Sequence, residues 1–295
     1  MIHPVDVHLL DGTYELFRHH FAVPSRRDAD GVEIAAARGV VSTVVMMLEE
    51  GATHLAVATD HTVESFRNDL YDGYKTGEGI DPDLFGQFPI LEDALRALGV
   101  TVLPMDTYEA DDGLASAARV AREDRRVGRI YLCTPDKDLA QCVEGDRVVQ
   151  LDRRKGELRD ADGVRAKFGV DPTSIADWLA LTGDSADGFP GLPGWGAKSS
   201  ATVLAHYGDL EAIPFDPTTW AVPVRGAARL AAALEAGIQD ARLFKDLATL
   251  RDDAEVGAVD EWRWSGPTPE FAVWTARLGL DRLTARIDAL AAARA

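Results

Sequence analysis

The chain contains little cysteine, no long hydrophobic run and a shortage of positive charge. Its two cysteines, Cys133 and Cys142, are too few for a disulfide framework or a cysteine zinc site. No apolar run approaches the roughly 20 residues that a membrane-spanning helix needs. The first residues mix charges with turn formers, so we expect no signal peptide, no membrane association and a cytoplasmic protein.

Acidic residues outnumber basic ones, with 49 aspartates and glutamates against 31 lysines and arginines and a formal net charge of −18. This balance argues against a generic basic protein that coats DNA. Hydrophobic residues make up 46% of the chain, which is ordinary for a globular protein, so disorder is not expected. At 295 residues, the chain should form one large or two smaller domains.

The first half alternates short β-branched runs with helical patterns, as parallel α/β folds do. The expected strands are Val5–Leu10, His54–Thr59, Val100–Pro104, Arg129–Thr134 and Arg147–Leu151. The expected helices among them are Ala35–Glu50, Phe88–Leu98 and Ala110–Arg122. We therefore predict an α/β fold with a central, mostly parallel sheet over residues 1–167.

From about Phe168 the pattern changes to short helices separated by glycine and proline. The expected helices are Ile175–Leu181, Ala197–Tyr207, Gly226–Ala236, Gln239–Leu250 and Arg282–Ala293. We therefore predict a helical region over residues 168–295.

The segment GFPGLPGWGAKSS indicates a tight turn between two helices, at about residues 183–208. Gly191, Gly194 and Gly196 permit positive φ and close approach of another backbone. The N–H groups at the start of the helix beginning at Ala197 are suited, together with Lys198, to holding a DNA phosphate. An ordinary glycine–proline loop is the alternative.

Acidic residues gather where the predicted strands end. They are Asp11, Asp60, Glu109, Asp111, Asp112, Asp136 and Asp138, and the pair Asp184 and Asp187 in LTGDSADGFPG is placed to complete a pocket. Each aspartate taken singly has a plain alternative as a helix cap or turn residue. Because the carboxyl ends of parallel strands form the ligand crevice of an open sheet, the conjunction favours a site.

Clustered carboxylates repel one another unless cations compensate their charge. A ligand set made only of oxygen favours Mg²⁺ or Mn²⁺ over zinc. Two such ions about 3.5–4 Å apart are the usual apparatus for in-line hydrolysis of a phosphodiester. The sequence therefore predicts a site for two or more divalent ions.

Five blocks of this sequence together resemble the 5′ nuclease family, which includes the 5′→3′ exonuclease domain of bacterial DNA polymerase I and the flap endonucleases. In family order, the blocks are LLDGTYELFR, ATDHTVESFRNDLYDGYK, YEADDGLAS, TPDKDLAQ and LTGDSADGFPGLPGWGAKSS. The resemblance implies a PIN-like α/β core and a helix-hairpin-helix region that binds DNA. Because the chain is too short to include a polymerase, the resemblance implies a stand-alone nuclease.

The implied activity is that of a metal-dependent 5′→3′ exonuclease and flap endonuclease in DNA replication and repair. Its implied partners are DNA with 5′ flaps, nicks, gaps or RNA-containing 5′ ends, including RNA primers to be removed. We expect such an enzyme to act as a monomer.

The resemblance also assigns roles to individual residues. The nine acidic residues named above would be metal ligands, directly or through water. Residues at about 64–90 would form a helical arch, in which Lys75 and Arg67 contact the scissile phosphate. Arg18 matches a basic position near the substrate, and the glycine turn matches a helix–turn–helix that grips duplex DNA, often with a bound K⁺. Other basic residues, such as Arg229 and Lys245, are expected to be solvated surface charges.

Two departures from the family pattern stand out. Glu78 lies three positions after Lys75, where the family commonly has an arginine, so one phosphate-binding cation is missing. His20 stands where polymerase relatives carry tyrosine or phenylalanine. If that aromatic ring stacks on a terminal base, His20 or Phe21 must replace it, and a plain surface histidine is the alternative.

Two other functions stay open at this stage. In a phosphohydrolase with an aspartyl nucleophile, Asp136 and Asp138 would form the Asp-x-Asp pair after a strand, but the other acidic residues and the glycine turn would have no role. In a non-catalytic binder of DNA structures, the metal site would have decayed.

Overall fold

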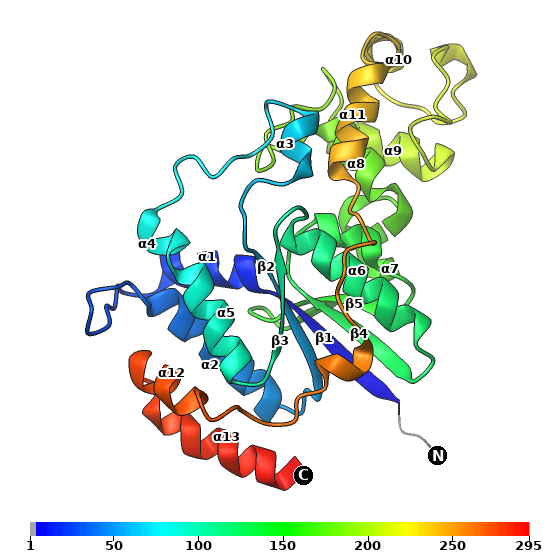
Figure 1. Cartoon of the computed structure of the whole chain (residues 1–295). Coiled ribbons are helices and arrows are strands. Elements are labelled where there is room, and N and C mark those ends of the chain that lie inside the picture. Colours follow the sequence, from blue (N-terminus) through cyan, green and yellow to red (C-terminus); the bar gives the residue numbers. More distant parts are fainter. Residues whose placement is uncertain (1–3, 295) are drawn as a thin grey trace. The chain divides into compact units, whose positions relative to one another are not determined.

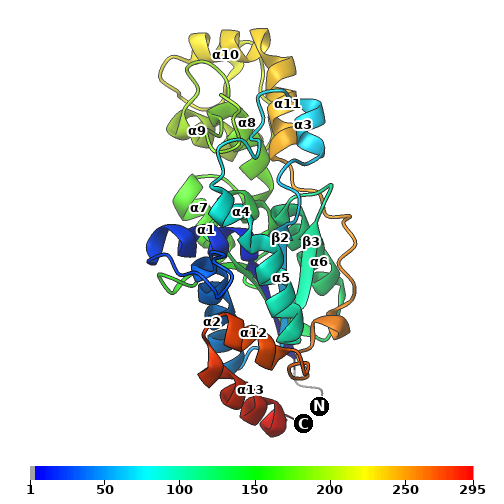
Figure 2. The same cartoon turned by 60° about the vertical axis from the view of Figure 1, so that its left-hand side comes forward.

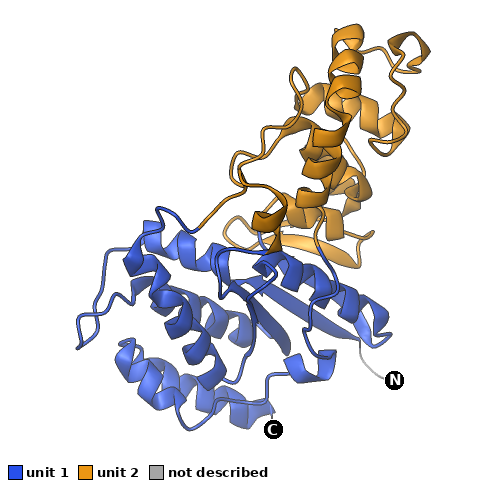
Figure 3. Ribbon diagram, turned by 45° about the horizontal axis from the view of Figure 1, so that its top comes forward, with its two compact units in different colours: residues 1–65, 77–134, 251–295 blue, residues 66–76, 135–250 orange. Residues whose placement is uncertain are grey.

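The computed structural model describes residues 4–294 and divides into two compact units. The first unit contains the chain up to Ser65, Gly77–Thr134 and the chain from Arg251, and the second contains Phe66–Thr76 and Pro135–Leu250 (Figure 3). The predicted split lies at a single place, between residues 167 and 168, whereas the first unit breaks after Thr134 and resumes at Arg251. Composition alone does not show on which unit a late helix packs.

The first unit is built on four parallel strands in the order β3-β2-β1-β4 (Figure 1). They are β1 (Val5–Asp11), β2 (His54–Asp60), β3 (Thr101–Met105) and β4 (Val127–Cys133). β2 is buried along its whole length except at its last residue, as expected for a strand covered on both faces. The predicted α/β fold with a mostly parallel sheet is confirmed.

Helices cover both faces of these strands. α6 (Ala110–Glu123) packs on one face of all four, whereas α1 (Gly12–Ala22) and α5 (Gln87–Ala97) pack on the other. α2 (Ala35–Glu49) packs against α1 and α5. Figure 2 shows the last helices, α12 (Phe271–Arg277) and α13 (Asp281–Arg294), on this side of the unit, where they contact α5 and α2.

The second unit is mainly helical. Its elements are α3 (Phe66–Leu70), the antiparallel pair β5 (Val148–Asp152) and β6 (Glu157–Arg159), α7 (Ala161–Phe168), α8 (Ile175–Thr182), α9 (Ala197–Tyr207), α10 (Ala227–Ala236), α11 (Ile238–Ala248) and three 3₁₀ helices (Asp138–Cys142, Pro172–Ser174 and Pro217–Thr219). α8 packs against α9 and α11 at the centre. Tyr74 is buried in this core, and the Tyr71 ring lies 5.9 Å from that of Phe244. The short segment that carries α3 is therefore anchored in this unit.

Every strand and helix predicted by range is present, and its ends agree within two residues. The helices α1, α7 and α12 and the three-residue strand β6 were not predicted. The expected arch segment contains α3 and the four-residue α4 (Pro82–Phe85). Among residues 4–294, no helix combines the length and the apolar character that crossing a membrane requires.

Candidate active site

In the first unit, the acidic residue at the end of β1 is held by neutral hydrogen-bond donors. Asp11 is the N-cap of α1, and its Oδ1 accepts the N–H of Tyr14 at 2.7 Å. Its Oδ2 accepts the hydroxyl of Thr134 at 2.9 Å, directly after β4. The ends of two neighbouring strands are thereby joined through one carboxylate.

A second acidic residue joins β2 to α6. Oδ1 of Asp60 accepts the N–H of Ala110 at 2.6 Å, and the N–H of Asp60 donates to Thr13 at 2.9 Å. Glu109, the residue before α6, is buried and accepts the hydroxyl of Ser65 at 2.8 Å. The first unit therefore gathers Asp11, Asp60 and Glu109 at the carboxyl edge of its sheet, as the sequence predicted.

Asp111 and Asp112 lie in the first turn of α6. Asp111 is half-buried, whereas Asp112 has no exposed surface. The two carboxylate oxygens of Asp112 accept the N–H groups of Glu109 at 3.0 Å and Arg251 at 2.8 Å. Asp112 thus links the start of α6 to the backbone at Arg251. Its role as a metal ligand stays a prediction.

In the second unit, three buried carboxylates meet. One oxygen each of Asp138, Asp184 and Asp187 lies within 4.8 Å of the others, and we call these residues the acidic trio. Asp138 opens the 3₁₀ helix, and Asp184 and Asp187 lie in the turn after α8. Asp136 stands beside the trio, and its Oδ1 accepts the N–H of Asp138 at 3.0 Å.

The acidic trio suits a divalent cation. Among residues 4–294, Oδ1 of Asp138 is buried without a hydrogen-bond partner. Burial, and then the negative charges of Asp136 and Asp187, raise the pKa of Asp138 well above the ordinary value of an aspartate. A hard cation bound by carboxylate oxygens would satisfy the orphaned atom and offset the repulsion. The residues present therefore fit the implied metal.

Two lysines supply positive charge to the acidic trio. The Lys75 ammonium lies 2.9 Å from Asp187, and that of Lys137 lies 2.5 Å from Asp184. Burial alone would lower the pKa of Lys137, but the charges of Asp138 and Asp184 outweigh it and raise that pKa. Lys75 was expected from the sequence, whereas Lys137 was not, because its only signal is its place between two predicted ligands.

The position of Lys75 is set by its backbone as well as its charge. Its N–H donates to the carbonyl of Asp187 at 3.0 Å, and its own carbonyl accepts from Nδ2 of Asn68 at 2.9 Å. Gly188 has φ +89°, and a Cβ there would lie 2.1 Å from the carbonyl oxygen of Gly73. Glycine is therefore required where the segment carrying Lys75 meets the turn of the acidic trio.

The environment of Arg67 contradicts the predicted contact with a phosphate. Arg67 is 1% exposed. Its Nε donates to the carbonyl of Leu247 at 2.8 Å and its Nη2 to that of Thr249 at 3.2 Å. These carbonyls lie at the end of α11, where unpaired carbonyls and the helix dipole attract a cation. Arg67 therefore fastens α3 to α11.

The glycine turn precedes α9. Gly191 and Gly194 have φ of +69° and +85°, and Gly196 is the N-cap of α9. Lys198, in the first turn of α9, is exposed. The Arg229 guanidinium lies about 3.4 Å from the place of a Cβ on Gly194, so this arginine, predicted to be a plain surface charge, belongs beside the turn. Lys245 instead pairs with Asp177 and Glu211.

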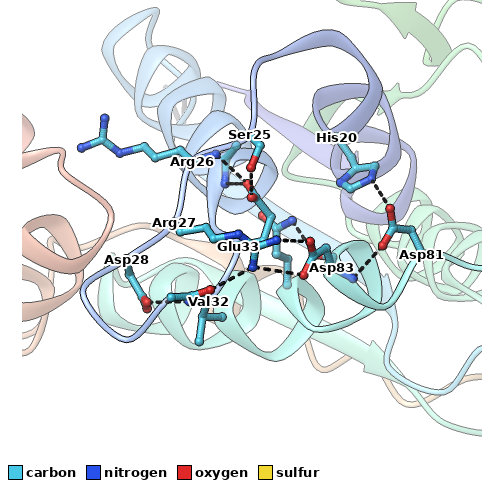
Figure 4. A network of polar contacts seen from close by, with 12 residues as sticks. His20, Ser25, Arg26, Arg27, Asp28, Val32, Glu33, Asp81 and Asp83 are labelled. Atoms are coloured by element: carbon cyan, nitrogen blue, oxygen red, sulfur yellow. Dashed lines mark hydrogen bonds and ion pairs between the residues drawn. The ribbon is translucent and has the colours of Figure 1, made fainter.

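Three further residues named in the sequence analysis, Arg18, His20 and Phe21, lie on α1. Arg18 pairs with Glu15 at 2.5 Å. Figure 4 shows His20 directed towards Asp81, and the Nε2–Oδ2 distance is 3.5 Å. The neighbouring Phe21 is 77% exposed. Phe21 therefore offers an open ring face, whereas His20 is engaged. Glu78 is exposed.

The chain matches two protein-family models along most of its length. The family model of the 5'-3' exonuclease N-terminal resolvase-like domain matches residues 6–169, and the family model of the 5'-3' exonuclease C-terminal SAM fold matches residues 170–270. A 5'-3' exonuclease of Aquifex aeolicus is 32% identical over 209 residues, which are 70% of this chain and 71% of that protein. DNA polymerase I of Rhizobium leguminosarum is 35% identical over 255 residues, 83% of this chain but only 24% of that protein. The chain thus spans about a quarter of such polymerases.

Solved structures show the same fold at low identity. A T5 5'-exonuclease with bound divalent metal ions (zinc) has a TM-score of 0.65 at 19% identity, covering 97% of this chain and 99% of that one. The catalytic core of Rad2 in complex with DNA substrate has a TM-score of 0.63 at 18% identity, covering 98% and 92%.

The fold is thus that of the 5′ nucleases. The chain belongs to the 5'-3' exonuclease family. The resemblance predicted from the five sequence blocks is confirmed.

Proposed function

We propose that this protein is a metal-dependent 5′ nuclease that hydrolyses phosphodiesters in DNA. The observation that carries the proposal is the acidic trio, in which three carboxylates converge and Oδ1 of Asp138 is buried without a partner among the described residues. Clustered carboxylates of this kind are suited to hard divalent ions, and Mg²⁺ or Mn²⁺ is the proposed cofactor.

The proposed ligands are the nine predicted acidic residues: Asp11, Asp60, Glu109, Asp111, Asp112, Asp136, Asp138, Asp184 and Asp187. Bound divalent ions would supply Lewis-acid stabilisation of the scissile phosphate. Within this set, the burial of Asp112 favours a bracing role over direct ligation. No protein nucleophile is required.

Lys75 is proposed to stabilise the charge that develops on the phosphate oxygens. Its ammonium already lies beside the acidic trio, and its backbone is bonded to Asp187 and Asn68. The exposed N-terminus of α9 is proposed to hold a phosphate of duplex DNA with the help of Lys198 and Arg229. A K⁺ ion at the glycine turn belongs to this part of the proposal.

The proposed substrates are DNA with a 5′ flap, nick, gap or RNA-containing 5′ end, so removal of RNA primers is a proposed role in replication and repair. Phe21, with its open ring, is proposed to stack on a terminal base in place of His20. Residues at about 64–90 are proposed to form the arch, and the enzyme is proposed to act as a monomer.

The test is cleavage of a 5′-labelled flap duplex in EDTA, Mg²⁺ or Mn²⁺, with Asp136→Asn as the control variant. We expect metal-dependent products near the flap junction for the wild type and none for Asp136→Asn, with DNA binding retained. Binding without cleavage in any metal would instead identify a binder of DNA structures. Turnover of a small phosphate ester, but not of flap DNA, would identify a phosphohydrolase.

A further inference from the structure

Lys137 occupies an unusual place in the second unit. It lies between Asp136 and Asp138 in the sequence, and its ammonium contacts a third carboxylate, that of Asp184, at 2.5 Å. Its side chain is one-third exposed, so the ammonium has a route to solvent. Its backbone caps the 3₁₀ helix Asp138–Cys142.

Hydrogen bonds hold the backbones of both lysines at the acidic trio. The N–H and carbonyl of Lys75 bond to Asp187 and Asn68, and the carbonyl of Lys137 accepts the N–H of Ala140 at 3.1 Å. The ammonium of Lys137 is held at the trio by its ion pair with Asp184, at the end of a flexible side chain. Lys137 can therefore swing away without any change in the fold.

An ammonium at this place competes directly with a metal ion. A divalent cation that uses Asp184 must either displace the lysine or share the carboxylate with it. Removing one positive charge a few ångströms from the cation should strengthen cation binding by about tenfold or more in a partly buried site. A lysine that merely held Asp184 in a ligating position would have the opposite effect when removed.

We infer that Lys137 is a built-in counter-ion of the acidic trio, which keeps the trio's carboxylates together without metal and lowers their affinity for divalent cations. It is a positioning residue that acts through Asp184, not a catalytic one. The inference rests on the proposed function, because the cation concerned is the one proposed for the trio. It extends that function by assigning the control of metal affinity to one side chain.

The test is calorimetric titration of the full chain with Mn²⁺ in the absence of DNA. Lys137→Met should bind Mn²⁺ about tenfold more tightly than the wild type, and Lys137→Arg should restore wild-type affinity within about twofold. The matched control is Lys155→Met, because Lys155 pairs with Asp152 outside the trio of the same unit. This control should also stay within about twofold of the wild type.

Thermal unfolding supplies a second readout. In EDTA, Lys137→Met should melt at a lower temperature than the wild type, because the trio loses a compensating charge. The rise in melting temperature caused by Mn²⁺ should nevertheless be larger for the variant, since tighter binding to the native state stabilises it more. A residue with only a packing role would not shift these two quantities in opposite directions.

Mn²⁺ affinity that is unchanged or weaker in Lys137→Met would overturn the inference. The variant Asp138→Asn separates this failure from failure of the proposed function. If Asp138→Asn binds Mn²⁺ as tightly as the wild type, the trio is not the metal site and both proposals fall. If Asp138→Asn loses binding while Lys137→Met leaves it unchanged, only the inference about Lys137 falls.

Discussion

The candidate metal ligands of the two units are held by different kinds of partner. In the first unit, Asp11, Asp60 and Glu109 accept hydrogen bonds from neutral groups, which are backbone N–H groups and hydroxyls. In the second unit, Asp184 and Asp187 face lysine ammonium groups, and Oδ1 of Asp138 accepts no bond from the described residues.

This difference separates two ways of holding clustered negative charge. Neutral donors stabilise a carboxylate whether or not a metal is present. Asp11, Asp60 and Glu109 should therefore contribute to the stability of the first unit even without metal. The acidic trio instead faces lysine ammonium groups, so the stability of the second unit should change most when a metal binds.

The largest expected effect is that of Asp138→Asn. Loss of a ligand from the trio should lower cleavage by at least about a thousandfold, because Lewis-acid stabilisation of the phosphate is worth several kcal/mol. The same change should raise the melting temperature in EDTA by about 2–4 °C, because it removes a buried, repelled charge. Cleavage assays measure the loss of activity, and thermal scans measure the change in melting temperature. A lower melting temperature of Asp138→Asn in EDTA would refute the proposed difference between the two units.

Asp112→Asn should show the opposite pattern in the first unit. The amide nitrogen cannot accept an N–H, so one bond to Glu109 or Arg251 is lost and unfolding should become easier by about 2 kcal/mol. Chemical denaturation measures this loss. Its neighbour Asp111→Asn is the matched control and should keep the stability while losing cleavage. Equal stability of the two variants would remove the bracing role of Asp112.

Lys198→Ala tests whether the second unit holds the DNA duplex. If Lys198 contacts a phosphate, the variant should bind duplex more weakly, and the slope of log affinity against log salt should fall by about one. Fluorescence anisotropy over a range of salt measures both quantities. Lys167→Ala, at an exposed site on α7, is the control and should keep the wild-type slope. An unchanged slope for Lys198→Ala would make the glycine turn purely structural.

The smallest expected effect concerns Glu33 of the first unit, shown in Figure 4. Burial acts to raise the pKa of Glu33, but the bonds from Ser25, Arg26 and Ala35 outweigh it and lower that pKa. Glu33 therefore adds stability above the ordinary pKa of glutamate, about 4.3, and this contribution is lost as the pH falls below it.

Glu33→Gln should cost about 1 kcal/mol at neutral pH. The difference from the wild type should shrink as the solution is acidified, which denaturation at several pH values can follow. Asp138, whose pKa is raised, should behave in the opposite way, since its ionisation destabilises the metal-free protein. A gap between Glu33→Gln and the wild type that is independent of pH would contradict the assigned role of Glu33.

Much of the fold and site was predictable because its signals are local. The strand ending at Asp11 and the helix opening at Ala110 follow from periodicity, and parallel strands bring their carboxyl ends to one edge. The turn at Gly188 needs glycine for a reason visible only in three dimensions, although the glycine-rich run already indicated a turn. The burial of Arg67 was not predictable, because its partners at Leu247 and Thr249 are distant in the sequence.

The α/β class, the acidic residues at strand ends and the family membership follow from the amino-acid sequence, because each of these depends on residues close along the chain. The folded chain alone shows that Lys137 meets Asp184, that Arg67 fastens α3 to α11, and that the last helices return to the first unit. These contacts join segments that are distant in the sequence. They depend on burial and charge in the folded chain, which the local sequence pattern does not contain.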